Sequence, residues 1–499
     1  NSVLQSENDK RDLLKLKEEV QNRTAAEYML RTGHSKPVTR REFLSSGVLG
    51  ATGAMILPSA LTMLANSGIA NAQVATYTCP SGAEAAAALK PGLFSIHLSG
   101  GAGLKGMFVG TDVGGGLVNG NNMNLGNVPN VTQRYGANFA SDHPFTAAFQ
   151  AELALSNISE AEVRIAPVIA TTNNDSSNDR IGVQYMASLA GIQGQILPVL
   201  GFGSNLNDAT AAPYLTPVGQ VPPKALSVGS LTNVQNAAVI SGALSQLSQA
   251  GQASVIRTVS SLSLDQVANL QSGGVSQLKQ LLYCSGVRNL EVNAAAGSTI
   301  IDPRLDPTFG AQISAIWGIN AATAPNNRDL MSATLLYNTL QGNSGMSTLS
   351  LGGYDYHQNA LADTTQDDLD FGRIWAKLLR TAKVMNRKCY FAITTDGHVV
   401  GNGAATRAAS QWNNDDSNSM QLMCFFDPAA TAAAPLRLLK GQLGAWAAGG
   451  AVTASGTSGG PGTEAAVAQA LMRGYLDFAK TPDSEILRIS NAPIGFKVI

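Results

Sequence analysis

Residues 347–394 constrain the fold more than any other stretch of the chain. A short apolar run at 347–351 is followed by an amphipathic helical pattern at 364–386 and by a second apolar run at 389–394. Strand, helix and strand in this order form a right-handed crossover unit, whose two strands belong to one parallel sheet. The stretch therefore predicts an α/β fold with a mainly parallel central sheet.

The same two patterns recur along the chain and predict further elements of such a fold. Strands are expected at residues 93–98, 164–170 and 195–201, and helices at 145–153, 181–191, 328–341 and 464–479. Residues 106–140 are rich in Gly and Asn and lack a helical period, which predicts a long surface excursion. Helices on both faces of the sheet would complete a three-layer sandwich.

The charge of the chain is close to zero, which excludes one class of partner. The 499 residues carry a net charge of −1, and only 13% of them are charged. Such a surface offers no general attraction to phosphate backbones, so no nucleic-acid partner is predicted. The four cysteines show no CxxC spacing, and Cys389 and Cys424 stand in apolar runs, where either a disulfide or buried free thiols would fit.

A basic motif near residue 40 indicates where the protein is sent. Thr39-Arg40-Arg41-Glu42-Phe43-Leu44 precedes an apolar run diluted by Gly, Ser and Thr, and Ala70-Asn71-Ala72 fits a small-x-small cleavage site before Gln73. This pattern resembles a twin-arginine (Tat) export signal. The resemblance implies the Tat translocon as a partner during export, and a destination in the periplasm, the cell envelope or the extracellular space.

The signal divides the chain into three predicted parts. Residues 1–39 form a polar extension with an amphipathic helical pattern, residues 40–72 form the signal or an anchor, and residues 73–499 form one α/β domain with loop insertions. Removal of the signal after Ala72 and its retention both remain open. In the second case residues 43–70 would associate with the membrane or with a partner.

Two Asp/His pairs follow the two strands of the crossover unit. Asp355 and His357 come after the first strand, and Asp396 and His398 come after the second. Ligands gather at the carboxyl ends of strands in parallel sheets, and carboxylate and imidazole groups together suit a divalent metal. The pattern predicts a site for zinc, or else for calcium or manganese. The alternative is that these side chains only cap turns and no metal binds.

These motifs together resemble the alkaline phosphatase/sulfatase superfamily, and in particular an uncharacterised Tat-exported branch of it. The resemblance covers most of residues 40–499. It is carried by three motifs: Arg40-Arg41-Glu42-Phe43-Leu44, Ser99-Gly100-Gly101 after an early strand, and Gly352-Gly353-Tyr354-Asp355-Tyr356-His357 after a later strand. The family implies an alkaline-phosphatase-like sandwich with metal-dependent hydrolysis of phosphate or sulfate esters.

The resemblance also suggests where a nucleophile and an anion-binding group would stand. Ser176 or Ser177 lies roughly where the family places its Ser or Thr nucleophile, and Arg180 follows them in the same polar loop, positioned to bind an anion. The competing interpretation is that this loop is an ordinary turn. His97, inside an apolar strand, and His143, before a helix, are expected to be structural.

The chain departs from the family at its metal ligands. The turn after the early strand has no carboxylate before Asp112, and no histidine follows His398. One ligand is therefore missing from each of the two metal sites that clamp the phosphoryl group. We therefore expect an exported, envelope-associated protein that acts as a structural or binding component of a larger assembly. It would work with protein partners or by self-assembly. The alternative is a metal-dependent phosphate- or sulfate-ester hydrolase.

Overall fold

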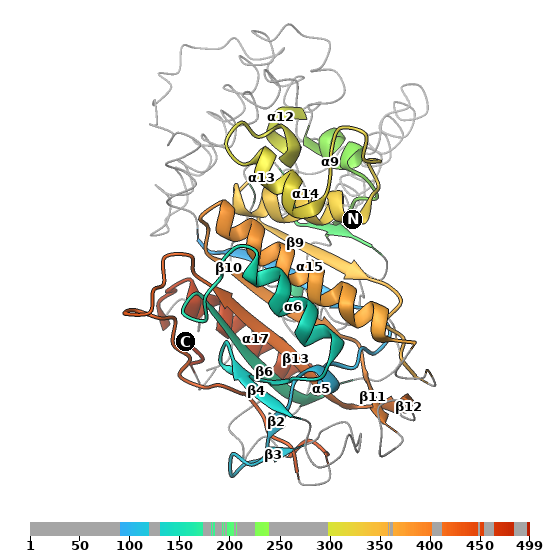
Figure 1. The fold of residues 1–499 in the computed structure, drawn as a ribbon, viewed down its shortest axis with the longest axis vertical. Coiled ribbons are helices and arrows are strands. Elements are labelled where there is room, and N and C mark those ends of the chain that lie inside the picture. Colours follow the sequence, from blue (N-terminus) through green and yellow to red (C-terminus); the bar gives the residue numbers. More distant parts are fainter. Residues whose placement is uncertain are drawn as a thin grey trace, which may run out of the picture. The chain divides into compact units, whose positions relative to one another are not determined.

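The computed structural model (Figure 1) describes a large part of the chain, all of it within the unit Ser67–Ile499. It describes residues 90–118, 130–172, 197–203, 225–238, 298–357, 363–401, 412–447, 450–453, 464–483 and 497–499, with a few single residues between 181 and 206 and at 359. The expectations for residues 1–72, and for Ser176, Ser177 and Arg180, fall outside this part.

A seven-stranded sheet forms the centre of the described structure. Its order is β6-β13-β10-β1-β9-β7-β8. The strands are β6 (Val163–Thr171), β13 (Asn418–Phe426), β10 (Cys389–Thr395), β1 (Gly92–Leu98), β9 (Met346–Leu351), β7 (Leu200–Phe202) and β8 (Leu226–Ser227). Only β13 runs antiparallel to its neighbours. The sheet is therefore mixed, and most of its strand pairs are parallel, as the sequence predicted.

The crossover unit predicted from residues 347–394 is present. Helix α15 (Thr365–Val384) connects β9 to β10, and both strands run parallel to β1. Strand β1 lies between them, with Leu93 paired to Met346 on one side and to Tyr390 on the other. This insertion means that the two Asp/His pairs follow strands that are separated by β1.

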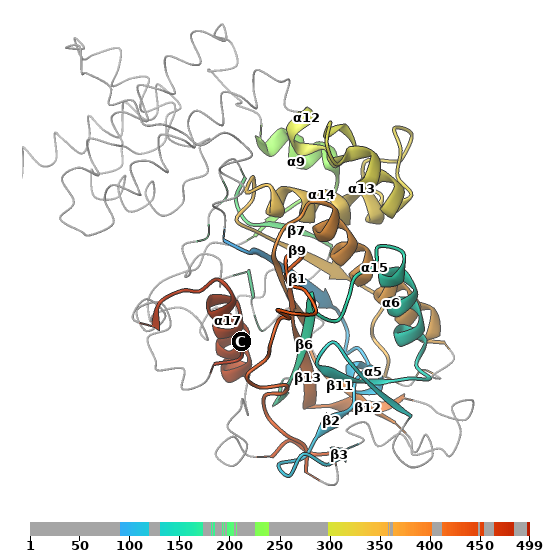
Figure 2. The same ribbon diagram turned by 60° about the vertical axis from the view of Figure 1, so that its left-hand side comes forward.

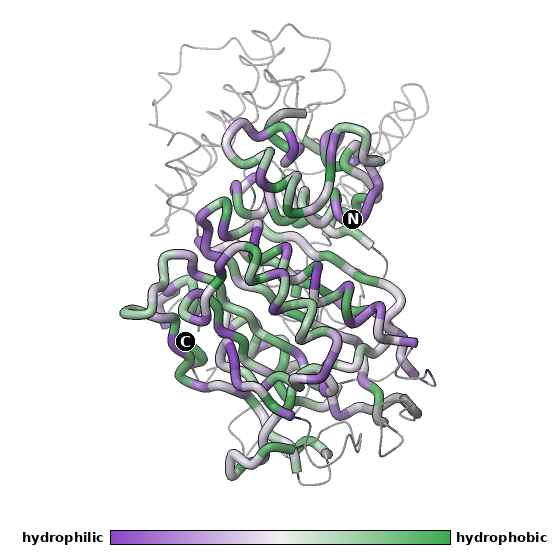
Figure 3. The backbone as a smooth tube through the Cα atoms, in the orientation of Figure 1, coloured by the Kyte–Doolittle hydropathy of each residue, from purple (hydrophilic) through white to green (hydrophobic). Residues whose placement is uncertain are grey.

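Helices cover both faces of the sheet, as the three-layer prediction requires. On one face lie α6 (Pro144–Ala154), α14 (Arg328–Leu340) and α15, and on the other lies α17 (Glu464–Phe478), as Figure 2 shows. Alternate strand residues feed the two apolar cores, since side chains in a strand point to opposite faces. Figure 3 shows α15 alternating between polar and apolar positions along its length.

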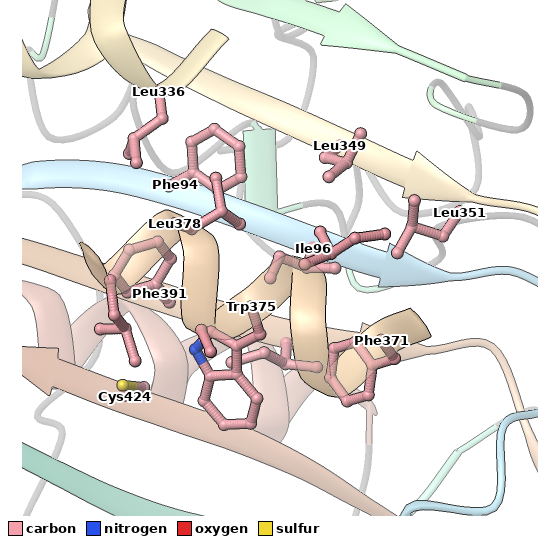
Figure 4. Close-up of a cluster of buried hydrophobic side chains, with 14 of the residues drawn as sticks. Phe94, Ile96, Leu336, Leu349, Leu351, Phe371, Trp375, Leu378, Phe391 and Cys424 are labelled. Carbon is pink, nitrogen blue, oxygen red and sulfur yellow. The ribbon is translucent and has the colours of Figure 1, made fainter. Parts of the chain in front are cut away.

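The larger core lies between the sheet and α15. Phe94, Ile96, Leu349 and Phe391 of the strands meet Trp375, Phe371 and Leu378 of the helix (Figure 4). The rings of Phe371 and Trp375 stack with centroids 5.6 Å apart. Packing of α15 against α6 extends this core, because Phe145 and Phe149 of α6 contact Trp375.

Smaller elements surround the sheet. They are α5 (Leu104–Met107), β2 (Gly110–Thr111), β3 (Leu117–Val118), β4 (Val131–Arg134), β5 (Ala137–Ala140), α9 (Leu231–Ala238), α12 (Ser298–Ile301), η2 (Pro303–Leu305), α13 (Gly310–Trp317), β11 (His398–Gly401) and β12 (Trp412–Asp416). The prediction of a surface excursion at 106–140 is wrong at both of its described ends. Met107, Phe108 and Val109 are buried at the first end. Tyr135 and Phe139 are buried, because the β4–β5 hairpin places their rings against Phe149. In the part of the chain that the structure describes, no helix combines the length and apolar character needed to cross a membrane.

The contact between α15 and the sheet provides a test of the core. Leu378 is fully buried, so Leu378→Ala should lower the free energy of unfolding by about 2–5 kcal/mol. Leu155→Ala is the matched control, because Leu155 is 68% exposed and should cost less than about 0.5 kcal/mol. Chemical denaturation of both variants measures the difference, and equal losses would contradict this description of the core.

Candidate functional site

The carboxyl ends of three central strands carry the residues singled out by the sequence. The turn at 99–103 follows β1, the loop at 352–357 follows β9, and residues 396–398 follow β10. Because the order in the sheet is β10-β1-β9, the β1 turn lies between the other two segments. Each predicted Asp/His pair therefore follows a strand on its own side of that turn.

The last residue of β10 and the residue after it bind the backbone of the β1 turn. The Gly100 N–H donates to Asp396 Oδ1 at 2.9 Å, and the Ala102 N–H donates to Thr395 Oγ1 at 2.9 Å. Asp396 is only 5% exposed. The Asp396 carboxyl group therefore already has a structural partner in the β1 turn.

His398 is held by the backbone in the same way. Its ring is fully buried, and Nε2 accepts a hydrogen bond from the Lys105 N–H at 3.1 Å. Nδ1 faces both the Val399 N–H at 2.9 Å and the Val399 carbonyl at 3.3 Å. The neutral ring has one acceptor nitrogen, so the tautomer that accepts from Lys105 carries its proton on Nδ1 and can donate to the carbonyl. Burial, and then the nearby positive charge of Lys105, lower the pKa of His398 well below its ordinary range, so the imidazole is neutral. The Nε2 lone pair that a metal would need is thus directed at α5.

The loop after β9 alternates between buried and exposed side chains. Tyr354 and Tyr356 point inward, where the Tyr356 hydroxyl donates to Asp368 Oδ1 at 2.8 Å. Burial raises the pKa of both tyrosines well above the ordinary value. The Asp355 carboxyl group and the His357 ring are in contact on the outer side, with 54% and 39% of their side chains exposed. This pair is therefore accessible to a ligand from solvent.

Gly100 in the β1 turn contacts one residue from each of the two predicted Asp/His pairs. Its φ of +114° lies in the region that favours glycine, and a Cβ there would stand 2.7 Å from the Asp355 nitrogen. The same residue donates its N–H to Asp396. The two predicted carboxylate residues thus approach the β1 turn from opposite sides, one through its backbone and one through its side chain.

The four predicted ligands form an inner pair and an outer pair. Within the described segments, no group of three or more His, Cys, Asp or Glu side chains is arranged to hold a metal ion. Asp396 and His398 are bound to backbone amides, and Asp355 and His357 are bound to each other. The present arrangement therefore does not fit a single four-ligand centre, and metal binding stays a prediction.

Lys105 is the residue near this site that the sequence analysis missed. It is 2% exposed, and its ammonium nitrogen lies 5.6 Å from the ring centroid of Trp446. A cation over a desolvated aromatic face is attracted by the electron density of the ring. The signal that points to Lys105 is its position in an otherwise apolar segment, two residues after the Gly101-Ala102-Gly103 turn.

The structural roles expected for the other residues are confirmed. His97 lies within β1, with Nδ1 3.1 Å from Thr394 Oγ1. His143 precedes α6, and its Nδ1 accepts the Phe145 N–H at 3.2 Å. Cys389 and Cys424 are buried free thiols, which resolves the alternative left open for them.

Comparisons with known proteins do not place the chain in a family. No family model, no curated protein and no solved structure matches it. The contacts of the site itself thus carry the functional argument.

The buried imidazole predicts how stability depends on pH. Unfolded chains protonate His398 near pH 6.5, whereas the folded chain resists protonation until a lower pH. Below about pH 6.5 the unfolded state therefore binds more protons, and the free energy of unfolding should fall by up to about 1.4 kcal/mol per pH unit.

Denaturation of His398→Gln between pH 7.5 and pH 5 tests this expectation. The variant should lack that part of the fall, since glutamine keeps an acceptor but does not titrate. His357→Gln is the control, because it removes an exposed imidazole from the outer loop. An identical pH dependence in wild type and His398→Gln would contradict the assignment.

Proposed function

We propose that this chain is an exported, envelope-associated protein that uses an alkaline-phosphatase-like α/β core as a binding or structural component of a larger assembly. One observation carries the proposal. The inner pair of predicted ligands, Asp396 and His398, accepts backbone N–H groups from Gly100 and Lys105. In this chain those side chains connect β10 to the β1 turn and to α5.

The free-energy cost of releasing His398 from the Lys105 amide to bind a metal supports the proposal. A metal at His398 Nε2 would leave the Lys105 N–H without its acceptor in a fully buried place. An unmet buried amide costs about 1–3 kcal/mol, and metal binding would have to exceed that cost. The missing carboxylate in the β1 turn and the missing late histidine point in the same direction.

A metal-dependent phosphate- or sulfate-ester hydrolase is the second candidate. The outer pair favours it, because Asp355 and His357 are accessible and lie beside the Gly100 turn. Oxygen and nitrogen donors of this kind suit zinc, and calcium or manganese less well. The family resemblance would add Ser176 or Ser177 as nucleophile and Arg180 as anion-binding group.

Element analysis of the purified full chain separates the two candidates. The proposed function predicts less than stoichiometric zinc, manganese and calcium, together with a defined complex or filament by light scattering and electron microscopy. The hydrolase predicts stoichiometric metal that is lost in Asp355→Asn/His357→Gln. This variant changes only exposed groups and should therefore fold. Metal loss with that variant and ester hydrolysis by the wild type would overturn the proposal.

The export step has its own test. The twin-arginine motif predicts that Arg40→Lys/Arg41→Lys keeps the protein in the cytoplasm, since the pathway recognises the arginine pair. Arg31→Lys is the matched control, because it changes a basic residue outside the motif. Cell fractionation and immunoblotting measure the distribution, and normal export of the double variant would contradict the assignment of residues 40–72.

A further inference from the structure

A cavity of about 460 Å³ lies apart from the strand-end site, between two hairpins and a later loop. One hairpin joins β2 to β3, the other joins β4 to β5, and residues 440–445 supply a third part of the lining (Figure 1). Every residue that lines the cavity belongs to the described part of the chain. Its volume falls within the range of pockets that hold small ligands. We call this cavity the hairpin groove.

Hydrogen bonds connect the walls of the hairpin groove to one another and to the sheet. Gln442 Oε1 accepts the Thr111 N–H at 2.9 Å, and Gln442 Nε2 donates to the Thr111 carbonyl at 3.0 Å. The Trp446 N–H donates to the same carbonyl at 3.0 Å, and the Leu443 N–H donates to the Pro167 carbonyl of β6 at 2.9 Å. The groove is therefore a fixed part of the fold, anchored to the strand at the edge of the sheet.

Two glycines in different walls offer free backbone groups to the groove. Gly136 belongs to the turn between β4 and β5, and its carbonyl oxygen lies 3.7 Å from the place that a Cβ of Gly441 would take. Among the described residues, neither glycine has a hydrogen-bond partner for its N–H or its carbonyl. Both glycines are exposed, so a ligand can reach these groups from solvent.

The backbone conformation accounts for only one of these glycines. Gly136 has a φ of +85° in a two-residue hairpin turn, and this region favours glycine. Gly441 lies outside that region of φ, and the Gly136 oxygen is the only described atom within 4 Å of its Cβ position. A side chain at position 441 would thus meet little resistance from the described fold, but it would take up space in the groove. Glycine is typical of places where a ligand approaches the backbone closely.

The charges and polar groups of the lining select the class of ligand. Asp112 and Lys440 contribute one negative and one positive charge, so the lining has no net charge and does not favour a multiply charged ligand. Free N–H and carbonyl groups of a backbone pair well with another backbone, because a peptide group carries both a donor and an acceptor. Val113, also in the lining, is 56% exposed and offers an apolar contact. An uncharged peptide with small apolar side chains meets these conditions.

We propose that the hairpin groove binds a short, extended peptide that has no net charge and bears small apolar side chains. The backbone N–H and carbonyl groups of the peptide hydrogen-bond to Gly136 and Gly441, as an added strand does at the edge of a sheet. One of its side chains contacts Val113. None of the strand-end residues lines the groove, so peptide binding does not depend on a metal at the strand ends.

Saturation-transfer NMR on the purified full chain tests the proposal, with acetyl-Ala-Ala-Ala-amide and acetyl-Ala-Val-Ala-amide as probes. At least one of the two peptides should show saturable transfer. Gly441→Leu should weaken its binding by about tenfold or more, because the new side chain takes the space that the peptide needs. Gly229→Leu is the matched control, since Gly229 is also exposed, has no φ in the glycine-favouring region and does not line the groove.

An ester analogue of the peptide tests the backbone contacts separately. Successive N–H groups of an extended chain point to opposite sides, so ester links in place of two successive amide groups remove a donor from each side. The analogue should bind about two- to tenfold more weakly than the peptide, because it lacks a hydrogen bond to a glycine carbonyl.

Three results would overturn the proposal. One is the absence of saturable transfer from both peptides, and another is equal binding by the wild type and Gly441→Leu. The third is an ester analogue that binds as tightly as the peptide. If circular dichroism shows that Gly441→Leu is unfolded, Gly441→Ala replaces it in the same comparison, since its added carbon makes only an ordinary contact with Gly136.

Discussion

The hydrogen bond from the Gly100 amide to Asp396 fixes the point where the chain leaves β1, and the rest of the strand-end region depends on it. Thr395 and His398 add contacts to Ala102 and Lys105, so three side chains at the end of β10 and just after it hold the turn and α5 in place. The turn can come so close because Gly100 has no Cβ to meet Asp355. The β1 turn thus separates the exposed pair, Asp355 and His357, from the buried pair, Asp396 and His398.

The hydrogen bonds of His97 and His398 are the reverse of what their places in the sequence suggest. His398 looks like a ligand in the sequence, yet its Nε2 is satisfied by the backbone. His97 looks like an ordinary core histidine, yet its Nε2 is buried without a partner among the described residues. Since an unmet buried group costs about 1–3 kcal/mol, the unpaired Nε2 of His97 lowers the stability of the fold, whereas the paired Nε2 of His398 does not.

Periodicity was sufficient to predict most of the sheet and its helices. The runs at 347–351, 364–386 and 389–394 correspond to β9, α15 and β10 with small differences at their ends. Periodicity could not show that β1 pairs between β9 and β10, because pairing depends on contacts between distant segments. The β4–β5 hairpin was missed for a related reason, since its Gly and Asn residues resemble those of an exposed loop while Phe139 packs against α6.

The candidate site shows the same limit at the level of single residues. Residue types and spacing identified Asp355, His357, Asp396 and His398, because strand ends in parallel sheets are where ligands gather. Which of these side chains is satisfied by the backbone depends on the path of the Gly100 turn, and Lys105 enters through that turn. Neither the path of this turn nor the position of Lys105 can be predicted from residue types and their spacing.

The position of β1 also has a kinetic consequence. The strand forms the middle of the sheet, yet His97 and its neighbour Thr394 are 297 residues apart in the chain. Until β1 inserts, β9 and β10 each present an unpaired edge. Closing so long a loop is slow, and exposed edges during that interval are templates for intermolecular pairing. The edges of β9 and β10 that β1 covers are therefore the part of the sheet most open to intermolecular pairing during folding.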